Sequence, residues 1–373
     1  MSQVPAQGLQ LLSTLGEDGR LTIEVVSKAV PTPRKHEVLI RVEAAPINPS
    51  DLALLFGPAD LASADYSQGK VVAAMPPAAQ QALKARAGQA MPVGNEGAGT
   101  VVAAGTAPEA QALVGTRVTT FGGGMYAQYR IADARTCMEL PEGVSAEQGA
   151  AAFVNPLTAL GFVETMRREG HSALVHTAAA SNLGQMLARI CKEDGVPLVN
   201  IVRSGEQVCL LKDLGAEHVV DSTEEGFSDA LFKAVAATRA TIGFDAIGGG
   251  KLAGQLFTAM ERVASAGAAF TRYGSTSAKQ VYIYGGLDTG PTILNRNFGF
   301  SWSLGGWLLT PFLARIGEHG AERLRQRVRD GLTTTFASTY KAKVTLSEML
   351  SSEAVAEYNA KRTGEKYLVL PNG

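Results

Sequence analysis

The sequence predicts an α/β protein built from a β-rich part and a doubly wound parallel sheet, and three observations support this. The chain has 373 residues, which is more than one compact domain usually holds. Between residues 20 and 135, short segments alternate apolar and polar residues. After Pro156, apolar segments alternate with helical ones, a pattern that indicates parallel βαβ units with right-handed crossovers.

The first part is expected to consist of short strands separated by turns. The run Val38-Leu39-Ile40-Arg41-Val42-Glu43 alternates as a strand with one buried face does. An alanine- and glutamine-rich stretch, helical in composition around residues 78–87, interrupts this pattern, so we interpret Pro58–Met91 as an insertion. The predicted strands are Leu21–Val26, Glu37–Ala44, Gly99–Ala104, Thr116–Thr120 and Tyr126–Ala132.

The second part is expected to alternate strands and helices. Its predicted strands are Ala173–Thr177, Leu198–Val202, His218–Asp221, Thr241–Ala246 and Val281–Tyr284. Its predicted helices are Leu183–Asp194, Glu206–Leu214, Ser228–Ala237 and Leu252–Met260. The segment from Tyr340 onward ends in a strand that should return to the first part. We therefore predict one domain from residues 1–153 and 338–373, and a second from residues 154–337.

Composition and charge exclude several classes of function. Lysine plus arginine number 34 and aspartate plus glutamate 35, so the net charge of −1 does not favour nucleic-acid binding. The three cysteines have no metal-ligand spacing, and their odd number does not suit a disulfide framework. The N-terminus lacks an export signal, so a cytoplasmic location is expected. The uncharged stretch Asn297–Ala314 contains three glycines and Pro311, which favours a buried strand and turn over a membrane span.

The turn after the strand at 173–177 has the spacing of a dinucleotide-binding site. There, backbone N–H groups and the positive end of a helix meet a pyrophosphate. A full Gly-x-Gly-x-x-Gly pattern would place glycine at 179, 181 and 184. Only Gly184 is present, and Ala179 and Ser181 occupy the other two positions. Asn182 can adopt the left-handed conformation that glycine otherwise supplies. Taken alone, the pattern fits either nucleotide binding or a plain tight turn.

The end of the second strand indicates which dinucleotide would bind. An acidic residue about twenty residues after the turn would accept the ribose 2′-hydroxyl of NAD. Here the strand ends in Arg203 and Ser204, whose guanidinium and hydroxyl suit a 2′-phosphate. These residues favour NADPH over NADH, the alternative being that Arg203 is an ordinary solvated residue.

Three ordered motifs precede this turn, and with them the chain resembles the medium-chain dehydrogenase/reductase superfamily. They are Ile47-Asn48-Pro49-Ser50-Asp51, Gly94-Asn95-Glu96-Gly97-Ala98-Gly99-Thr100-Val101-Val102 and Val154-Asn155-Pro156-Leu157-Thr158-Ala159. The chain is most similar to the zinc-free branch of NADPH:quinone oxidoreductases and 2-enoyl thioester reductases. The resemblance implies a GroES-like β-barrel-type catalytic domain, with a Rossmann NADPH-binding domain between its two segments.

The resemblance also implies how the metal positions are filled. Zinc-dependent relatives bind the catalytic metal through cysteine, histidine and cysteine. The matching positions here are Asn48, Asn95 and Val154, which are poor zinc ligands, so no metal is expected.

The resemblance assigns roles to individual residues. Asn48 would face the nicotinamide and substrate, and Thr158 would bond near the nicotinamide ribose or carboxamide. Tyr66 is the candidate proton donor and Tyr126 is a further catalytic candidate, although each also suits an ordinary surface or packing role. The remaining cofactor-binding candidates are Ala179, Ala180, Ser181, Asn182, Leu183, Gly184, Arg203, Ser204, Ile247, Gly248, Tyr284, Gly285, Phe300, Trp302 and Lys366.

These observations together predict a zinc-independent, NADPH-dependent reductase that delivers hydride to a quinone or another activated α,β-unsaturated carbonyl. A 2-enoyl thioester reductase and a non-catalytic NADPH-binding sensor or structural protein remain as alternatives. A second surplus, the segment Arg262–Gln280, is longer than the turn that the resemblance implies there. It would either cover the active-site mouth or form a solvated loop. The apolar stretch Asn297–Ala314 lies where relatives pair their sheets, so a homodimer is expected.

Overall fold

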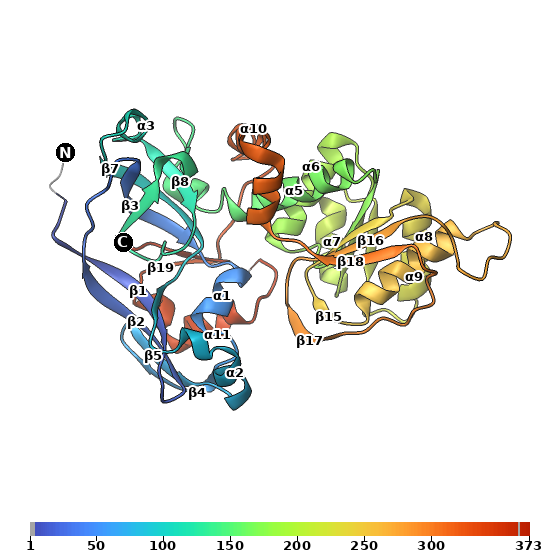
Figure 1. The fold of residues 1–373 in the computed structure, drawn as a ribbon, viewed down its shortest axis with the longest axis horizontal. Coiled ribbons are helices and arrows are strands. Elements are labelled where there is room, and N and C mark those ends of the chain that lie inside the picture. Colours follow the sequence, from blue (N-terminus) through green and yellow to red (C-terminus); the bar gives the residue numbers. More distant parts are fainter. Residues whose placement is uncertain (1–3, 365) are drawn as a thin grey trace. The chain divides into compact units, whose positions relative to one another are not determined.

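The computed structural model describes residues 4–364 and 366–373, which fall into two compact units (Figure 1). Unit 1 contains the chain up to Val154 together with Val328–Gly373, and unit 2 contains Asn155–Arg327. The chain re-enters unit 1 at Val328, inside helix α10 (Leu309–Asp330), whereas the sequence placed this return at residue 338. Among the described residues, no helix is both long and apolar enough to cross a membrane.

Unit 1 is built around two mostly antiparallel sheets. The first has the order β4-β5-β2-β1-β6, and the second has the order β10-β8-β7-β3-β20-β19, with β9 also paired to β3. The strands of the first sheet are β1 (Gln7–Leu15), β2 (Arg20–Ala29), β4 (Asp60–Ser67), β5 (Lys70–Ala74) and β6 (Ala90–Pro92). Those of the second are β3 (Glu37–Pro46), β7 (Glu96–Ala104), β8 (Arg117–Phe121), β9 (Tyr129–Asp133), β10 (Met138–Glu139), β19 (Ala342–Val344) and β20 (Tyr367–Val369).

Strand β3 shows how alternation produces the core of unit 1. Val38, Ile40 and Val42 have no exposed surface, whereas Arg41 between them is exposed. Buried residues of both sheets form one apolar cluster, onto which most of the short helices pack, while Ala146 belongs to a smaller cluster with Ala44, Ala98 and Leu368. These helices are α1 (Pro49–Leu55), α2 (Pro77–Ala82), α3 (Pro108–Ala112), α4 (Ala146–Gly149) and α11 (Ser352–Asn359).

The predicted insertion Pro58–Met91 is more ordered than its composition indicated. It contains the antiparallel hairpin β4–β5, and β5 pairs with β2 of the main sheet. Strand β1, which pairs with β2 along its whole length, was also absent from the prediction. Both segments are rich in small or polar residues, so their apolar alternation is weak and pairing with β2 determines their conformation.

Unit 2 contains a six-stranded parallel sheet of order β13-β12-β11-β14-β16-β18, which confirms the doubly wound prediction. Its strands are β11 (Leu174–His176), β12 (Leu198–Val202), β13 (His218–Asp221), β14 (Ile242–Asp245), β16 (Lys279–Ile283) and β18 (Trp302–Gly306). Its helices are α5 (Val154–Arg168), α6 (Asn182–Asp194), α7 (Gly205–Asp213), α8 (Phe227–Thr238), α9 (Leu252–Ala264) and the first part of α10. A small parallel pair, β15 (Gly248–Gly250) and β17 (Asp288–Thr292), lies beside this sheet.

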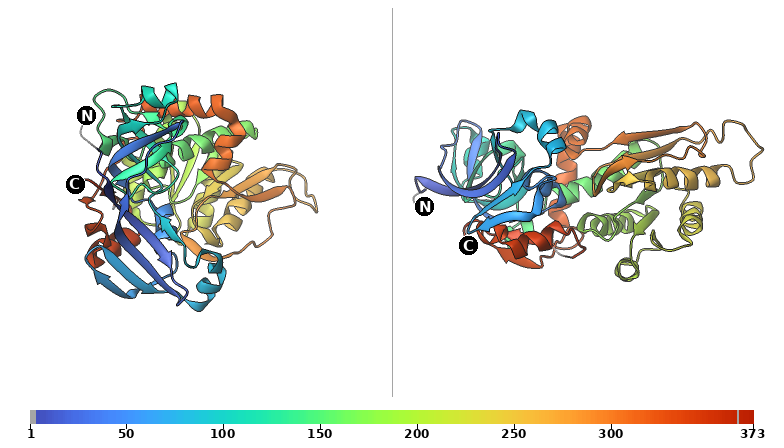
Figure 2. Two further views of the ribbon diagram at one scale, coloured as in Figure 1. Left: turned by 60° about the vertical axis from the view of Figure 1, so that its left-hand side comes forward. Right: turned by 90° about the horizontal axis from the view of Figure 1, so that it is seen from below.

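The second predicted surplus, Arg262–Gln280, begins in the last turn of α9 and ends in β16. Figure 2 shows the segment between α9 and β16 as a loop that extends away from the sheet. The base of the loop is fixed by a buried ion pair, in which Lys279 Nζ lies 2.6 Å from Glu261 Oε2. Glu261 also accepts hydrogen bonds from the backbone N–H and the hydroxyl of Ser275.

Candidate functional site

The turn between β11 and α6 in unit 2 has the geometry of an anion-binding helix start. Ser181 is the N-cap of α6, and its hydroxyl accepts a hydrogen bond of 3.1 Å from the backbone N–H of Gly184. The left-handed residue of the turn is Ala178, at φ 50°, whereas Asn182 is the first residue of the helix. The prediction that Asn182 adopts the left-handed conformation is therefore wrong. Because α6 is long and begins at the sheet edge, its first N–H groups and its dipole favour a phosphate.

Gly184 is the glycine that this turn cannot replace. A Cβ at this position would overlap the carbonyl oxygen and carbon of Ala179. Helix α6 therefore packs directly against the backbone of the turn, as the last glycine of a dinucleotide-binding pattern allows. Ala179 and Ala180 are themselves buried, so small side chains there keep the turn compact.

A buried carboxylate that the sequence analysis missed joins the turn to the next strand. Asp245, at the end of β14, is fully buried and accepts hydrogen bonds from the Thr177 hydroxyl (2.8 Å) and the Ile247 N–H (2.9 Å). The Thr177 hydroxyl in turn accepts the N–H of Ala246 at 2.8 Å. These bonds fix the carboxyl ends of β11 and β14 in one arrangement. The only sequence signal was that both residues lie at the carboxyl ends of apolar strands.

Tyr284, at the end of β16, faces the interior of unit 2. Its hydroxyl lies 2.7 Å from Nε2 of His176, which is fully buried, while Tyr284 is partly buried. Burial raises the pKa of Tyr284 and lowers that of His176 to about 3. The next residue, Gly285, allows a close approach, because a Cβ there would lie 2.6 Å from the carbonyl oxygen of Ala246. Predicted residues Ile247, Gly248, Tyr284 and Gly285 thus share the sheet edge at which the β11–α6 turn lies.

Arg203 follows β12 at the same sheet edge and is exposed. Its guanidinium has no hydrogen-bond or ion-pair partner among the described residues. Its backbone N–H donates to Gln207 Oε1 at 3.0 Å, and Ser204 caps α7 by accepting the N–H of Gln207. Gln207 therefore fixes the backbone of this strand end, while the cation extends into solvent.

Two predicted cofactor residues, Phe300 and Trp302, lie at the amino ends of the parallel strands, whereas the β11–α6 turn lies at their carboxyl ends. Strand β18 runs parallel to β16 with Trp302 opposite Lys279, the first residue of β16. Trp302 packs against Phe257 and Phe298, and the neighbouring Phe300 is 74% exposed. This register corrects the expectation that Phe300 and Trp302 border the same site as the turn. Thr158 lies buried on α5, and its predicted role stays a prediction.

Unit 1 contains a buried polar cluster around Asn48, which is 2% exposed and caps α1. Asn48 Nδ2 donates to Glu96 Oε1 at 2.8 Å. The second oxygen of Glu96 accepts the backbone N–H groups of Phe153 (3.0 Å) and Val154 (2.7 Å). Asp51 accepts the backbone N–H of Asn48 at 2.8 Å. Asn48 is thus held by two carboxylates that come from different segments of the chain.

Lys366 completes this cluster from the C-terminal strand. Because Leu368 of β20 pairs with Pro46 of β3, Lys366 lies beside Asn48. Its Nζ is buried and has no hydrogen-bond partner among the described residues. Burial lowers the pKa of Lys366, while the nearby carboxylates of Glu96 and Asp51 oppose that shift. The predicted closeness of Lys366 to the cofactor stays a prediction.

Burial also controls the ionisation of the two acids. It raises the pKa of Asp51 to about 7, despite hydrogen bonds from the backbone N–H groups of Asn48 and Asn95 that lower it. Burial raises the pKa of Glu96 as well, and the ammonium of Lys366 is the largest opposing effect. The cluster therefore combines two acids and one base in a region that excludes water.

The two tyrosines that are catalytic candidates occupy different environments. Tyr126 is fully buried, and its hydroxyl donates to the carbonyl oxygen of Pro46 at 3.0 Å, so the structure favours its packing role. Tyr66 lies on β4, where its hydroxyl is 3.3 Å from the carbonyl oxygen of Leu61, and burial raises its pKa. Tyr66 lines a pocket together with Ser347 and Glu348, and none of these contacts links it to the cluster around Asn48.

The three positions that match zinc ligands in zinc-dependent relatives all form hydrogen bonds within unit 1. The side chain of Asn48 bonds Glu96, that of Asn95 bonds the Ser50 hydroxyl at 3.0 Å, and Val154 uses its backbone N–H. Within residues 4–364 and 366–373, no group of three or more His, Cys, Asp or Glu side chains could hold a metal ion.

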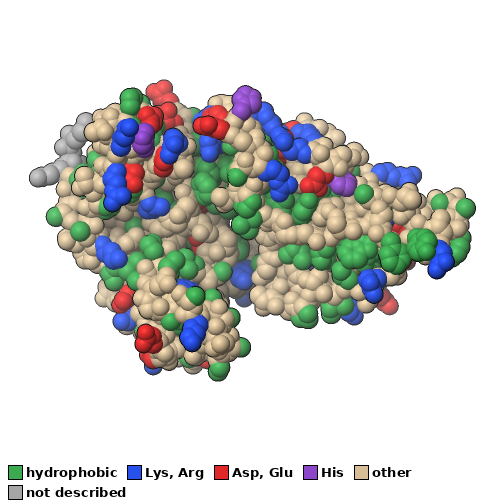
Figure 3. Space-filling model, viewed as in Figure 1, with side chains coloured by type: hydrophobic (Ala, Val, Ile, Leu, Met, Phe, Trp, Pro, Cys, Tyr) green, Lys and Arg blue, Asp and Glu red, His purple; other side chains and the backbone are tan. Residues whose placement is uncertain are grey.

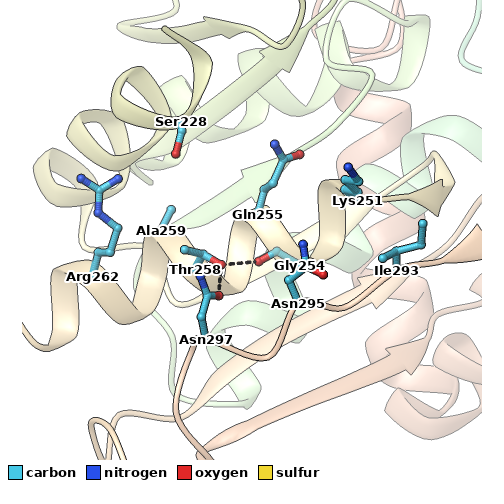
Figure 4. Close-up of a pocket in the computed structure, with 10 residues that line it drawn as sticks. All are labelled: Ser228, Lys251, Gly254, Gln255, Thr258, Ala259, Arg262, Ile293, Asn295 and Asn297. Atoms are coloured by element: carbon cyan, nitrogen blue, oxygen red, sulfur yellow. Dashed lines mark hydrogen bonds between the residues drawn. The ribbon is translucent and has the colours of Figure 1, made fainter. Parts of the chain in front are cut away.

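A separate pocket of about 200 Å³ lies along α9. In Figure 4, Gln255 and Arg262 extend from this helix and Lys251 from the residue before it, while Asn297, between β17 and β18, bonds Thr258. None of the catalytic or cofactor-binding residues predicted from the sequence lines this pocket, although Arg262 and Asn297 begin two of the segments that the sequence singled out.

Comparison with known proteins relates both units to oxidoreductases. Residues 34–142 match the family of the alcohol dehydrogenase GroES-like domain. The chain is 28% identical to a quinone oxidoreductase of Pseudomonas aeruginosa over 159 residues, which are 42% of this chain and 49% of that protein. It is 28% identical to human quinone oxidoreductase over 212 residues, 56% of each chain. The matched part thus spans about half the length of these relatives.

Solved structures match over nearly the whole chain. A protein from Mesorhizobium loti, solved as a candidate NADPH:quinone reductase, is 28% identical, with a TM-score of 0.76 over 99% of this chain and all of that one. A mycobacterial protein in complex with NADPH shares the fold at 20% identity, with a TM-score of 0.70 over 97% of this chain and all of that one.

Proposed function

We propose a reductase function from one premise: the chain belongs to the medium-chain dehydrogenase/reductase superfamily, in its quinone oxidoreductase-like branch. On this premise the protein is a zinc-independent, NADPH-dependent oxidoreductase. It transfers hydride to a quinone or to another activated α,β-unsaturated carbonyl compound.

The observation that carries the proposal is the combination of the β11–α6 turn with the free cation of Arg203 at the end of the adjacent strand. The start of α6 fits a pyrophosphate, because Ser181 and Gly184 shape a compact turn at the positive end of the helix. The Arg203 guanidinium fits a 2′-phosphate, and no acidic side chain occupies that strand end. Together these features favour NADPH as the reductant.

NADPH, when bound, supplies the hydride from its nicotinamide ring. The protein's task is then to hold the dinucleotide and to stabilise the negative charge that develops on the substrate oxygen. In unit 2, Ala179 to Gly184, Arg203 and the loop ends after β14 and β16 would bind the cofactor. In unit 1, Asn48 would contact the nicotinamide and the substrate. Asn48 and Asn95 hold hydrogen bonds to Glu96 and Ser50, and the proposal assigns no role to a metal ion.

The direct test is NADPH oxidation with 1,4-benzoquinone and a panel of enones, followed at the nicotinamide absorbance band. We expect acceptor-dependent oxidation that zinc chelators leave unchanged. An absence of oxidation across the panel would defeat the proposal. NADPH binding without turnover on any acceptor would instead support the non-catalytic alternative.

The cofactor assignment has its own test in Arg203→Asp. This change replaces the guanidinium with a carboxylate that repels a 2′-phosphate and suits a free 2′-hydroxyl. We expect NADPH binding to weaken by at least 100-fold, while NADH binding changes little. Equal losses for the two cofactors would contradict the assignment. Lys212→Asp, on the neighbouring helix α7, is the matched charge control.

A second candidate activity is 2-enoyl thioester reduction. The chain is 26% identical to the mitochondrial enoyl-[acyl-carrier-protein] reductase of Caenorhabditis elegans over 268 residues, 69% of this chain and 66% of that protein. This activity needs a proton donor to the α-carbon, and Tyr66 is the sequence candidate. Activity with a crotonyl thioester that disappears in Tyr66→Phe would favour the second candidate over quinone reduction.

We also propose that the protein forms a homodimer through the edge strand β18 of unit 2. Figure 3 shows hydrophobic side chains gathered along this side of unit 2. The exposed apolar side chains near β18 include Tyr273, Phe300 and Leu308, and an edge strand offers unpaired backbone groups to a second copy. Sedimentation should show a dimer at micromolar concentration, and a monomer alone would refute it. A cytoplasmic location stays a prediction of the sequence.

A further inference from the structure

Glu96 is a buried acid that the proposed reaction does not use, and it contacts Asn48 directly. We propose that Glu96 is the positioning residue for Asn48: its carboxylate determines which end of the Asn48 amide faces Glu96 and which end faces away from it. The role of Asn48 in hydride transfer rests on the proposed function, whereas the orientation of its amide does not.

The chemistry of hydrogen bonding constrains the orientation of the Asn48 amide. An asparagine side chain has a carbonyl oxygen that only accepts and an NH₂ group that only donates, and either end can in principle face a given neighbour. An ionised carboxylate only accepts. The contact of 2.8 Å between Asn48 and Glu96 Oε1 therefore forces the NH₂ group of Asn48 toward Glu96. The amide orientation follows from the charge of Glu96.

Glu96 is itself fixed by the backbone. It is fully buried, and its second oxygen accepts the N–H groups of Phe153 (3.0 Å) and Val154 (2.7 Å). Since backbone donors cannot turn away as side chains can, they hold the carboxylate in one rotamer. Asn48 is fixed from its other side by Asp51, which accepts its backbone N–H. Movement of the Asn48 amide would have to break a charge-assisted hydrogen bond.

Burial raises the pKa of Glu96, and the charges and hydrogen-bond donors around it oppose this shift and favour an ionised carboxylate. Lys366 contributes a buried ammonium, and it is the cation nearest to both Glu96 and Asp51 in the described cluster. The other titratable groups that face Glu96 are the carboxyl of Asp51 and the phenols of Tyr126 and Tyr340. Buried carboxylates need a cation or several donors to remain charged, and Glu96 has both.

The isosteric change Glu96→Gln tests the proposal. In a glutamine the amide oxygen must accept the N–H groups of Phe153 and Val154, so its NH₂ group would face Asn48 and favour the reversed orientation of the Asn48 amide. We expect kcat with NADPH and quinone to fall on the order of 10- to 100-fold, because a misoriented catalytic group costs rate even when it remains present. The dissociation constant of NADPH should stay within twofold. Glu142→Gln, an exposed position in unit 1, is the matched control and should retain wild-type kcat.

A second measurement is independent of activity. In wild-type protein labelled with ¹⁵N-asparagine, one side-chain proton of Asn48 should be protected from solvent exchange and shifted downfield by the carboxylate. The signal is assigned by its loss in Asn48→Asp. We expect Glu96→Gln to remove the shift and the protection.

The outcomes separate this proposal from the proposed function. A wild-type protein without turnover on any acceptor would defeat the proposed function. The side-chain NMR signal of Asn48 would then be the measurement that tests whether Glu96 positions this amide. An unprotected Asn48 amide in the wild-type protein would overturn the inference, even if Glu96→Gln fails to fold. Unchanged kcat in a folded Glu96→Gln variant would overturn it as well.

Discussion

His176 allows a quantitative test of the packing inside unit 2. The side chain is fully buried, its Nε2 lies 2.7 Å from the Tyr284 hydroxyl, and its Nδ1 has no partner among the described residues. Its ring lies beside Phe162, at 6.0 Å between centroids. Burial lowers the pKa of His176 from 6.5 to about 3, so the folded protein keeps this imidazole neutral.

The sign and size of the effect on stability follow from this shift. In the unfolded chain His176 takes up a proton below pH 6.5, whereas in the folded protein it does so only near pH 3. Its contribution is therefore fully present above pH 6.5 and is lost as the pH falls toward 3. At pH 5 the difference is about 1.5 pH units at 1.36 kcal/mol each, which is a loss of about 2 kcal/mol.

Urea unfolding between pH 5 and pH 8 can measure this loss through tryptophan fluorescence. Both tryptophans, Trp302 and Trp307, belong to unit 2, so the signal reports the unit that contains His176. We expect the wild type to lose about 2 kcal/mol more than His176→Gln between pH 7 and pH 5. The exposed position His319→Gln should behave as the wild type. Parallel pH curves for the wild type and His176→Gln would refute the reasoning.

Two further substitutions test other parts of unit 2. Gly184→Ala forces a methyl group against the backbone of Ala179, so we expect a loss of about 1–3 kcal/mol in unfolding free energy and weaker NADPH binding, measured by urea unfolding and fluorescence titration. Unchanged binding would show that α6 can move away from the turn. Lys279→Met leaves the buried carboxylate of Glu261 without its cation, and we expect a loss of about 3–5 kcal/mol by urea unfolding. The double variant with Glu261→Leu should recover most of this loss, and a double variant as unstable as Lys279→Met would contradict the charge argument.

Local patterns predicted much of unit 2. The bounds of β12 (Leu198–Val202) and β13 (His218–Asp221) were predicted to the residue, because each is a short apolar run between a helix and a polar turn. Helix α10 was missed, since Pro311 and two glycines obscure its pattern. The backbone of α10 does leave the helical conformation at Gly317, where φ is 73°.

The candidate cofactor-binding residues of unit 2 were partly predictable, because local sequence patterns locate the strands that precede them. The β11–α6 turn and Arg203 both follow strands, and parallel strands bring their carboxyl ends to one edge. Phe300 and Trp302 were assigned by resemblance, and the register of β18 against β16 placed them at the other edge. A sequence motif carries no information about register unless the pairing strand is known.

The sequence by itself determined the order of the elements, the two-part α/β architecture and the positions of the turn and of Arg203, because these depend on local periodicity and on residues close together in the chain. Only the tertiary structure decided which polar groups meet in the interior. Asp245 reaches Thr177 across adjacent strands, and Glu96 joins Asn48 to the start of α5, while β20 brings Lys366 beside them. Buried charges are stabilised by partners in space rather than in sequence, so their roles became visible only once the chain was folded.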